Sequence, residues 1–195
     1  MLKVGITGGI GSGKTTVCKI FETLGIPVYY ADDRAKWLMM HDQGLKKQII
    51  EIFGPAAYLE NGQLNRTYIG QIAFTTPDKL KALNAAVHPA VAKDSVIWNK
   101  AQKEVPYTLK EAALLFEAGS YKLLDKIITV TAPVEMRIER VMQRDQVDRA
   151  AVLARMDKQW PEKEKVERAD FVINNDDQKG LIKQVLAIHQ ALSKI

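Results

Sequence analysis

The stretch GITGGIGSGKTT, residues 5–16, decides the fold of this chain. Residues 8–15 match the pattern G-x-x-x-x-G-K-[ST], whose glycines let backbone N–H groups turn inward onto phosphate oxygens. The stretch that follows has helical character, and the positive end of such a helix faces the same anion. We therefore expect the phosphates of a nucleotide to be held by Gly8, Gly9, Ile10, Gly11, Ser12, Gly13, Lys14, Thr15 and Thr16.

Two side chains of this motif carry its chemistry. Lys14 is long enough to reach the β- and γ-phosphates, and the Thr15 hydroxyl is a suitable ligand for Mg²⁺. A strand-like run precedes the motif at residues 2–7, and a helical stretch follows over residues 14–24. This strand-to-helix junction is the context that a phosphate loop requires, so it favours phosphate binding over a plain glycine-rich turn.

The composition is that of a globular protein. The chain has 195 residues, of which 47% are hydrophobic and 26% charged, enough to bury a core without disulfides or metal. Its single cysteine, Cys18, makes no internal bridge, and no signal peptide precedes the first strand, so we expect a cytoplasmic location. No apolar run approaches about 18 residues, which argues against a membrane span.

The net charge of +5 suits a nucleic acid, a membrane surface or a small polyanion. Lysine and arginine are spread along the chain, without a run of five or more. Together with the phosphate motif, this spread favours the small polyanion. We expect neither a nucleic acid nor a membrane partner, and a monomer or weak homo-oligomer.

The order of the elements indicates an α/β fold. A strand, a helix and a second strand at residues 26–31 form the unit of a parallel sheet. Residues 32 to about 104 look helical nearly throughout, with a cap at Asn65 and a break or kink at His88-Pro89. Further strands are expected at residues 107–116, 126–132 and 171–174. Further helices are expected at residues 133–145 and 179–193, and another is expected to begin after the cap Asp148.

These elements predict a single domain with a three-layer core and a mainly parallel five-stranded sheet. The core comprises residues 1–31 and 105–195, and a helical insertion spans about 32–104. A switch GTPase would carry N-K-x-D, but Asn99-Lys100-Ala101-Gln102 lacks the aspartate. A large ATPase would need a longer chain and an acidic motif at the end of a strand, which this sequence lacks. A short chain with this insertion therefore indicates a small-molecule kinase.

Such a kinase needs a carboxylate near the attacking hydroxyl, and its natural place is the carboxyl end of the second strand. Asp32 and Asp33 stand there. Position favours Asp32 over Asp33 for this role, and the alternative is that both residues cap a helix.

A helix over residues 133–145 would carry a row of arginines. Arg137, Arg140 and Arg144 fall within about 60° of one another on a helical projection. Guanidinium groups suit phosphate oxygens, so we expect the row to close over the nucleotide. The alternative is a solvated face paired with Glu135 and Glu139.

The ordered set of motifs resembles the dephospho-coenzyme A kinase family over essentially the whole chain. Three positions depart from the family pattern: Tyr30 in place of an aspartate, Ala113 in place of a proline, and Asn174 where the family often has an aspartate. The matching segments are Thr7–Thr15, Gly25–Asp32, Leu83–Pro89, Ala112–Glu117, Arg140–Asp145, Gln159 and Ala169–Asn175.

The resemblance implies an ATP- and Mg²⁺-dependent kinase that phosphorylates the ribose 3′-hydroxyl of dephospho-coenzyme A, the last step of coenzyme A synthesis. It also implies a P-loop core, an insertion that embraces the acceptor, and a mobile lid at about residues 140–162. Asp32 would then orient the acceptor hydroxyl and take its proton. Arg140 and Arg144 would neutralise the charge that develops as the bridging oxygen leaves.

The resemblance also implies roles for four more residues, and alternatives stay open for some of them. Glu117 either holds Mg²⁺ through water beside the acceptor or simply ends a strand, and Arg66 either binds the acceptor's diphosphate or begins a solvated helix. His88 belongs to a family segment that would contact the acceptor, although its chemistry favours packing between helices. Asn175 stands after the last strand, where adenine would bind. Shikimate and nucleoside monophosphate kinases, and an ATP-sensing regulator without chemistry, remain rival interpretations.

Overall fold

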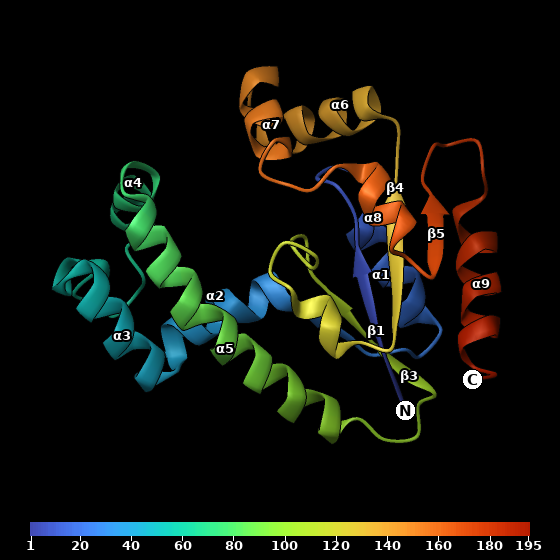
Figure 1. Ribbon diagram of the computed structural model, residues 1–195, viewed down its shortest axis with the longest axis horizontal. Coiled ribbons are helices and arrows are strands. Elements are labelled where there is room, and N and C mark those ends of the chain that lie inside the picture. The colour runs from blue at the N-terminus through green and yellow to red at the C-terminus, as the bar shows by residue number, and fades with distance from the viewer. The chain divides into compact units, whose positions relative to one another are not determined.

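The computed structural model describes residues 1–195, apart from the side chain of Phe74. The chain divides into two compact units, one comprising residues 1–30 and 101–195 and the other residues 31–100. The first unit contains a five-stranded sheet in the order β2-β3-β1-β4-β5, and every neighbouring pair of strands is parallel (Figure 1). The predicted α/β class with a parallel five-stranded sheet is thus confirmed. The strands are β1 (Leu2–Thr7), β2 (Val28–Tyr30), β3 (Tyr107–Glu111), β4 (Lys126–Thr131) and β5 (Phe171–Asn174).

Strand β1 lies at the centre of the sheet, and its residues 4–7 are therefore buried on both faces, as expected for a parallel sheet. Its Ile6 pairs with Glu111 of β3, and Glu111 in turn pairs with Tyr30 of β2. The carboxyl ends of β1 and β2 therefore open at the same edge of the sheet, separated by β3.

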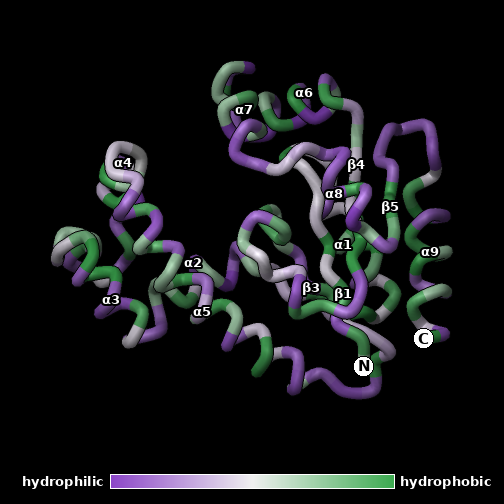
Figure 2. The backbone as a smooth tube through the Cα atoms, in the orientation of Figure 1, coloured by the Kyte–Doolittle hydropathy of each residue, from purple (hydrophilic) through white to green (hydrophobic). Residues whose placement is uncertain are grey.

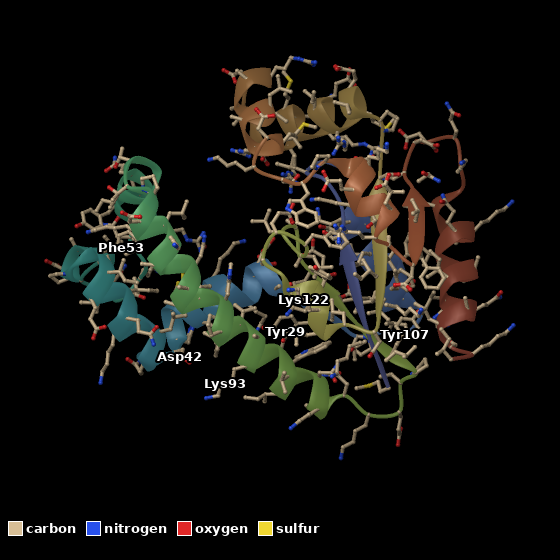
Figure 3. The ribbon with its side chains drawn as sticks, in the orientation of Figure 1. Tyr29, Asp42, Phe53, Lys93, Tyr107 and Lys122 are labelled. Atoms are coloured by element: carbon tan, nitrogen blue, oxygen red, sulfur yellow. The ribbon has the colours of Figure 1, made fainter. Side chains whose placement is uncertain are left out.

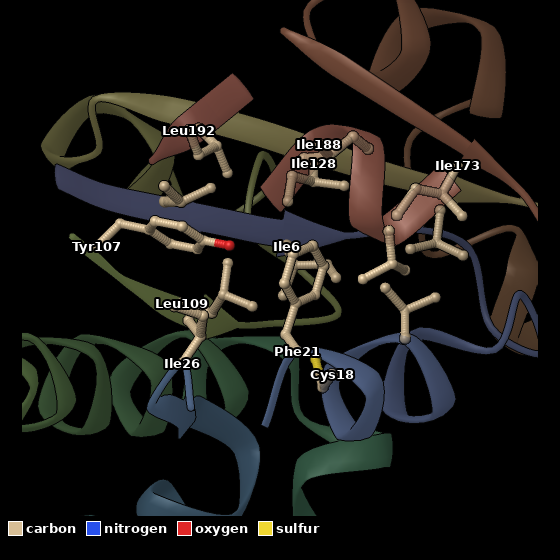
Figure 4. Packing of buried hydrophobic residues seen from close by; sticks show 14 residues of the cluster. Ile6, Cys18, Phe21, Ile26, Tyr107, Leu109, Ile128, Ile173, Ile188 and Leu192 are labelled. Carbon is tan, nitrogen blue, oxygen red and sulfur yellow. The ribbon is translucent and has the colours of Figure 1, made fainter. Parts of the chain in front are cut away.

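One face of the sheet is covered by α1 (Lys14–Thr23) and α9 (Leu181–Leu192) (Figure 4). Phe21 of α1 meets the ring of Tyr107 edge to face, at 6.3 Å between centroids. The Tyr107 hydroxyl is hydrogen-bonded to Nδ1 of His189 in α9 at 2.8 Å. The two helices and the sheet therefore share one core.

The opposite face is covered by the segment after β3, which includes η2 (Ser120–Leu123), and by α8 (Glu162–Glu167). A Cβ atom on Gly5 would lie 2.8 Å from Leu115 and 2.6 Å from Leu124, so this segment packs directly on β1. The Thr129 hydroxyl donates a hydrogen bond to the Lys165 carbonyl of α8 at 3.3 Å. The sheet is thus the middle of three layers.

Two further helices follow β4, α6 (Val134–Asp145) and α7 (Arg149–Met156). They share a small apolar cluster built on Ile138, Val141 and Val152. The Asp148 carboxylate accepts the Ala151 N–H at 2.8 Å, so the predicted cap of α7 is confirmed. Figure 2 shows that the loop between β5 and α9 is hydrophilic, whereas β5 itself is hydrophobic.

The unit of residues 31–100 is helical. Figure 3 labels Asp42 and Phe53 at the two ends of α3, where Asp42 accepts the Leu45 N–H at 2.9 Å as the cap. Asn65 accepts the Tyr68 N–H at 3.2 Å and confirms the predicted cap of α4. The elements are α2 (Ala31–His41), α3 (Gln43–Phe53), η1 (Pro55–Ala57), α4 (Arg66–Thr75) and α5 (Pro77–Ala101).

The observed elements differ from the expected ones at three places. Helix α5 runs through Pro89 undivided, because Pro89 and Ala85, one turn earlier, are exposed and water can satisfy the unpaired carbonyl. Strand β3 ends at Glu111 rather than at residue 116, and α8 was not foreseen. Among the described helices, none combines the length and the apolar character needed to cross a bilayer.

Candidate active site

The phosphate loop occupies residues 8–13, between the end of β1 and the start of α1. Gly11 and Gly13 have φ values of +79° and +90°, a region that residues with a Cβ rarely adopt. The Ser12 N–H donates to the Gly9 carbonyl at 3.1 Å, and Lys14 Nζ donates to the Gly8 carbonyl at 3.0 Å. The loop is therefore wound tightly at the amino end of α1, the geometry in which helix and loop amides attract an anion.

Three segments distant in sequence hold this loop. The side-chain amide of Asn175, just beyond β5, donates to the Ser12 carbonyl at 2.8 Å. The side-chain carbonyl of Gln159 accepts the Ile10 N–H at 2.8 Å. The backbone of Arg137 lies so close to Gly11 that a Cβ atom there would collide with it. The loop is thus fixed by side chains as well as by its own backbone.

The arginines of α6 do not form the single row predicted from the sequence. Arg137 is only 5% exposed and pairs with Glu162 at 3.0 Å, because α6 packs against the loop on that side. Burial raises the pKa of Glu162, and the Arg137 guanidinium opposes that rise. Arg137 is therefore part of the support beneath the loop.

Arg140 and Arg144 have different surroundings. Arg140 donates to the Asn175 carbonyl at 3.3 Å and pairs with Asp177 at 3.1 Å, so the structure brings Arg140 and Asn175 together beside the loop. Arg144 pairs with Asp145 at 2.7 Å. The hydrogen bond from Arg144, followed by that from Arg155, lowers the pKa of Asp145 to about 2.

A cavity of about 300 Å³ lies at the carboxyl ends of β4 and β5, at the lower end of the usual size for a ligand pocket. It shares Glu162 with the ion pair beneath the loop. Its lining residues are Thr131, Ala132, Pro133, Val134, Glu162, Asn174 and Asp176.

Glu117 lies in the segment after β3 and is held by two donors. Its Oε1 accepts the Trp160 N–H at 2.7 Å and lies 2.8 Å from Nζ of Lys165, a side chain with no exposed surface. Burial raises the pKa of Glu117, but the hydrogen bonds from Lys165 and Trp160 outweigh it and hold the pKa below its usual value. Its expected contact with Mg²⁺ or the acceptor stays a prediction.

The donor set of the loop fits a magnesium ion held mainly by a nucleotide. Thr15 is the second residue of α1 and has an exposed side chain. Within the described part of the chain, no three His, Cys, Asp or Glu side chains gather into a metal site of their own. Mg²⁺ bound to nucleotide phosphates needs only one or two protein oxygens, and keeps water at its other positions.

A family model described as dephospho-CoA kinase matches residues 2–180 of this chain. The chain belongs to the dephospho-CoA kinase family. A relative of that name from Salinibacter ruber is 44% identical over 178 residues, which cover 90% of this chain and 89% of the relative. Membership of this family makes the chain a kinase, a phosphotransferase of coenzyme A synthesis.

Two solved structures are similar to this member of the dephospho-CoA kinase family over nearly their whole length. A Thermus thermophilus protein has a TM-score of 0.82 at 34% identity, with 100% of this chain and 97% of that protein covered. A dephospho-CoA kinase from Campylobacter jejuni has a TM-score of 0.71 at 28% identity, with 98% and 97% covered.

Three of the residues predicted for this kinase's acceptor lie in the unit of residues 31–100. Asp32 is exposed in the first turn of α2, two residues after β2 ends, beside the equally exposed Asp33. Arg66 is the exposed first residue of α4. His88 is exposed on α5, so the interpretation that it packs between helices was wrong.

Sequence reasoning missed the supports of the site. Gln159 was noted only as part of a family segment, and its contact with Ile10 spans 149 positions. Lys165 lies in the run EKEKVE, which reads as a solvated face, yet it is completely buried. No local signal distinguishes it from the lysines around it.

Proposed function

We propose that this chain transfers the γ-phosphoryl group of ATP to the ribose 3′-hydroxyl of dephospho-coenzyme A, giving coenzyme A and ADP. The observation that carries the proposal is the family match over residues 2–180, which includes a phosphate loop wound at the amino end of α1. Phosphoryl transfer needs positioning and charge neutralisation more than covalent chemistry, and the loop supplies both.

The loop residues Gly8 to Thr16 hold the triphosphate through their backbone N–H groups. Lys14, which already reaches the Gly8 carbonyl at 3.0 Å, contacts the β- and γ-phosphates. Thr15 is the residue that would ligate Mg²⁺, and the bound ion supplies charge neutralisation at the β- and γ-phosphates. Asn175 borders the adenine, next to the cavity at the ends of β4 and β5.

Asp32 orients the acceptor hydroxyl and accepts its proton. It follows β2, whose carboxyl end opens at the same sheet edge as that of β1. Arg140 and Arg144 neutralise the charge that develops on the leaving ADP. Arg140 exchanges its partner Asp177 for phosphate oxygen in this step.

The unit of residues 31–100 receives the acceptor. Arg66 is suited to the acceptor's diphosphate because a guanidinium group forms paired hydrogen bonds with phosphate oxygens. His88 and Glu117 are proposed as further contacts with the acceptor, and Glu117 would hold Mg²⁺ through water. Residues 140–162 act as the lid, which excludes water from the reacting phosphate.

The protein acts in the cytoplasm on a small-molecule substrate, as a monomer or weak homo-oligomer, without a nucleic acid or membrane partner. The dispersed basic residues, which are not gathered in runs, support the part of this proposal that concerns nucleic acid and membranes.

A panel of acceptors tests the proposed function. ADP release from ATP is measured with dephospho-coenzyme A, shikimate, a nucleoside monophosphate, or no acceptor. We expect release only with dephospho-coenzyme A, and its loss in Lys14→Ala. Release with another acceptor supports a rival kinase, and tight ATP binding without any acceptor-dependent release supports an ATP sensor.

A further inference from the structure

Gln159 is a residue to which the reaction above gives no role. It lies between α7 and α8, half-buried, and its side-chain oxygen accepts the Ile10 N–H at 2.8 Å. Ile10 stands inside the phosphate loop, between Gly9 and Gly11. A hydrogen bond at this point fixes a peptide plane that its two glycine neighbours leave free to turn.

The segment that carries Gln159 is itself anchored to the layer that covers the sheet. The next residue, Trp160, donates its backbone N–H to Glu117 at 2.7 Å and stacks on Phe116, with ring centroids 5.7 Å apart and planes 12° from parallel. Lys165, fully buried, pairs with the same oxygen of Glu117 at 2.8 Å. The residue that follows Gln159 is thus tied to the layer that covers the sheet.

A second contact from the same segment reinforces this arrangement. Glu162 pairs with Arg137 at 3.0 Å, and the Arg137 guanidinium lies where a Cβ atom on Gly9 would be. Residues 159 and 162 therefore constrain the loop on both sides of the Gly9–Ile10 peptide. A loop held in its binding conformation before the ligand arrives loses less conformational entropy when the ligand binds.

We propose that Gln159 is a positioning residue of the phosphate loop: it holds the Ile10 amide, and so keeps the loop in the conformation that binds the triphosphate. The proposal rests on the proposed function only in taking a nucleotide as the ligand of the loop. Because one hydrogen bond is lost, Gln159→Leu is expected to weaken ADP binding and raise the KM for ATP about two- to tenfold, while kcat changes less.

Three variants separate this role from general stability. Gln159→Leu removes the acceptor at nearly constant volume, Gln159→Glu keeps an oxygen acceptor, and Gln190→Leu makes the matched change on the exposed side of α9. Hydrogen exchange of the Ile10 amide is measured without nucleotide, together with the Kd for ADP, the KM for ATP, kcat and the thermal midpoint.

The proposal predicts faster exchange at Ile10 and weaker ADP binding in Gln159→Leu, slow exchange restored in Gln159→Glu, and no change in Gln190→Leu. Wild-type exchange at Ile10 or a wild-type Kd for ADP in Gln159→Leu would overturn it. So would a fall in kcat and in protection across all amides, which marks a purely structural role. A wild-type protein without acceptor-dependent ADP release would instead refute the proposed function, whereas the exchange and ADP-binding results would still decide the role of Gln159.

Discussion

The side-chain amide of Asn175 lies 2.8 Å from the main-chain carbonyl of Ser12, and this hydrogen bond joins the end of β5 to the phosphate loop. The same amide group stands where a Cβ atom on Gly13 would be. A glycine is therefore needed at position 13 for two reasons. It allows the left-handed backbone of the loop, and it leaves room for the side chain of Asn175.

Gly13→Ala is accordingly expected to abolish tight ATP binding. Gly25→Ala is the matched control, because Gly25 has a φ of +79° but open space around its Cβ position. Both variants incur backbone strain of about 1–2 kcal/mol, but only Gly13→Ala displaces Asn175. Calorimetric titration with ATP, alongside thermal unfolding, separates the two effects. Equal ATP affinity in the two variants would disprove the role assigned to this contact.

Asp32→Asn is expected to lower turnover by about 10²-fold or more while ATP binding survives, because the amide no longer accepts the acceptor's proton. Asp33→Asn is the matched control, since Asp33 is also exposed in the first turn of α2 and pairs with Lys36 at 2.7 Å. Initial rates with saturating dephospho-coenzyme A give the comparison. Turnover like that of the wild type in Asp32→Asn would remove this residue from the mechanism.

Much of the fold was predictable because its signals are local. Asn65 and Asp148 were recognised as helix caps from the residues that follow them, and the phosphate loop from an eight-residue pattern. Helix α8 was not predicted, because its six residues form a charged run without an apolar stripe. Its position depends on Lys165 reaching Glu117 of another segment, a contact that the spacing of residues does not reveal.

The candidate site, too, was predicted only where its signals are local. The phosphate loop was predicted by motif, whereas its supports come from far along the chain, as with Gln159 and Ile10. Helical projection grouped Arg137 with Arg140 and Arg144. In the folded protein, however, Arg137 packs against the loop and pairs with Glu162. A projection gives the angle of a side chain, and its neighbours decide whether that angle faces solvent.

The buried pair between Lys165 and Glu117 gives a stability prediction. Lys165→Met leaves a buried carboxylate without its partner and is expected to cost about 3–5 kcal/mol in the free energy of unfolding at neutral pH. The double variant Lys165→Met with Glu117→Gln should recover part of this loss. Lys163→Met, in the exposed pair with Glu167, is the control and should leave the urea midpoint unchanged.

The pair between Lys165 and Glu117 also makes the stability of the protein depend on pH. Because the folded state lowers the pKa of Glu117, its contribution to stability is present above the usual carboxyl value of 4.5 and is lost as the pH falls through the lower folded value. Lys165→Met removes much of that contribution, so the gap in stability between wild type and variant should narrow below pH 4.5. A gap that stays constant over this range would contradict the assignment.

Cys18 is expected to be inert in the folded protein. It is completely buried in α1, and burial followed by the nearby Glu111 carboxylate raises the pKa of its thiol far above the usual value. Since it is the only cysteine, a thiol reagent reports on it directly. We expect slow labelling in buffer and fast labelling in urea, and fast labelling in both would contradict its position in the core.

The site of phosphorylation tests the central claim most directly. Dephospho-coenzyme A is incubated with ATP, Mg²⁺ and the protein, and the product is examined by phosphorus NMR. We predict one new phosphomonoester coupled to the ribose 3′-proton, absent with Lys14→Ala. Free phosphate without a new ester, or an ester at another position of the acceptor, would contradict the account.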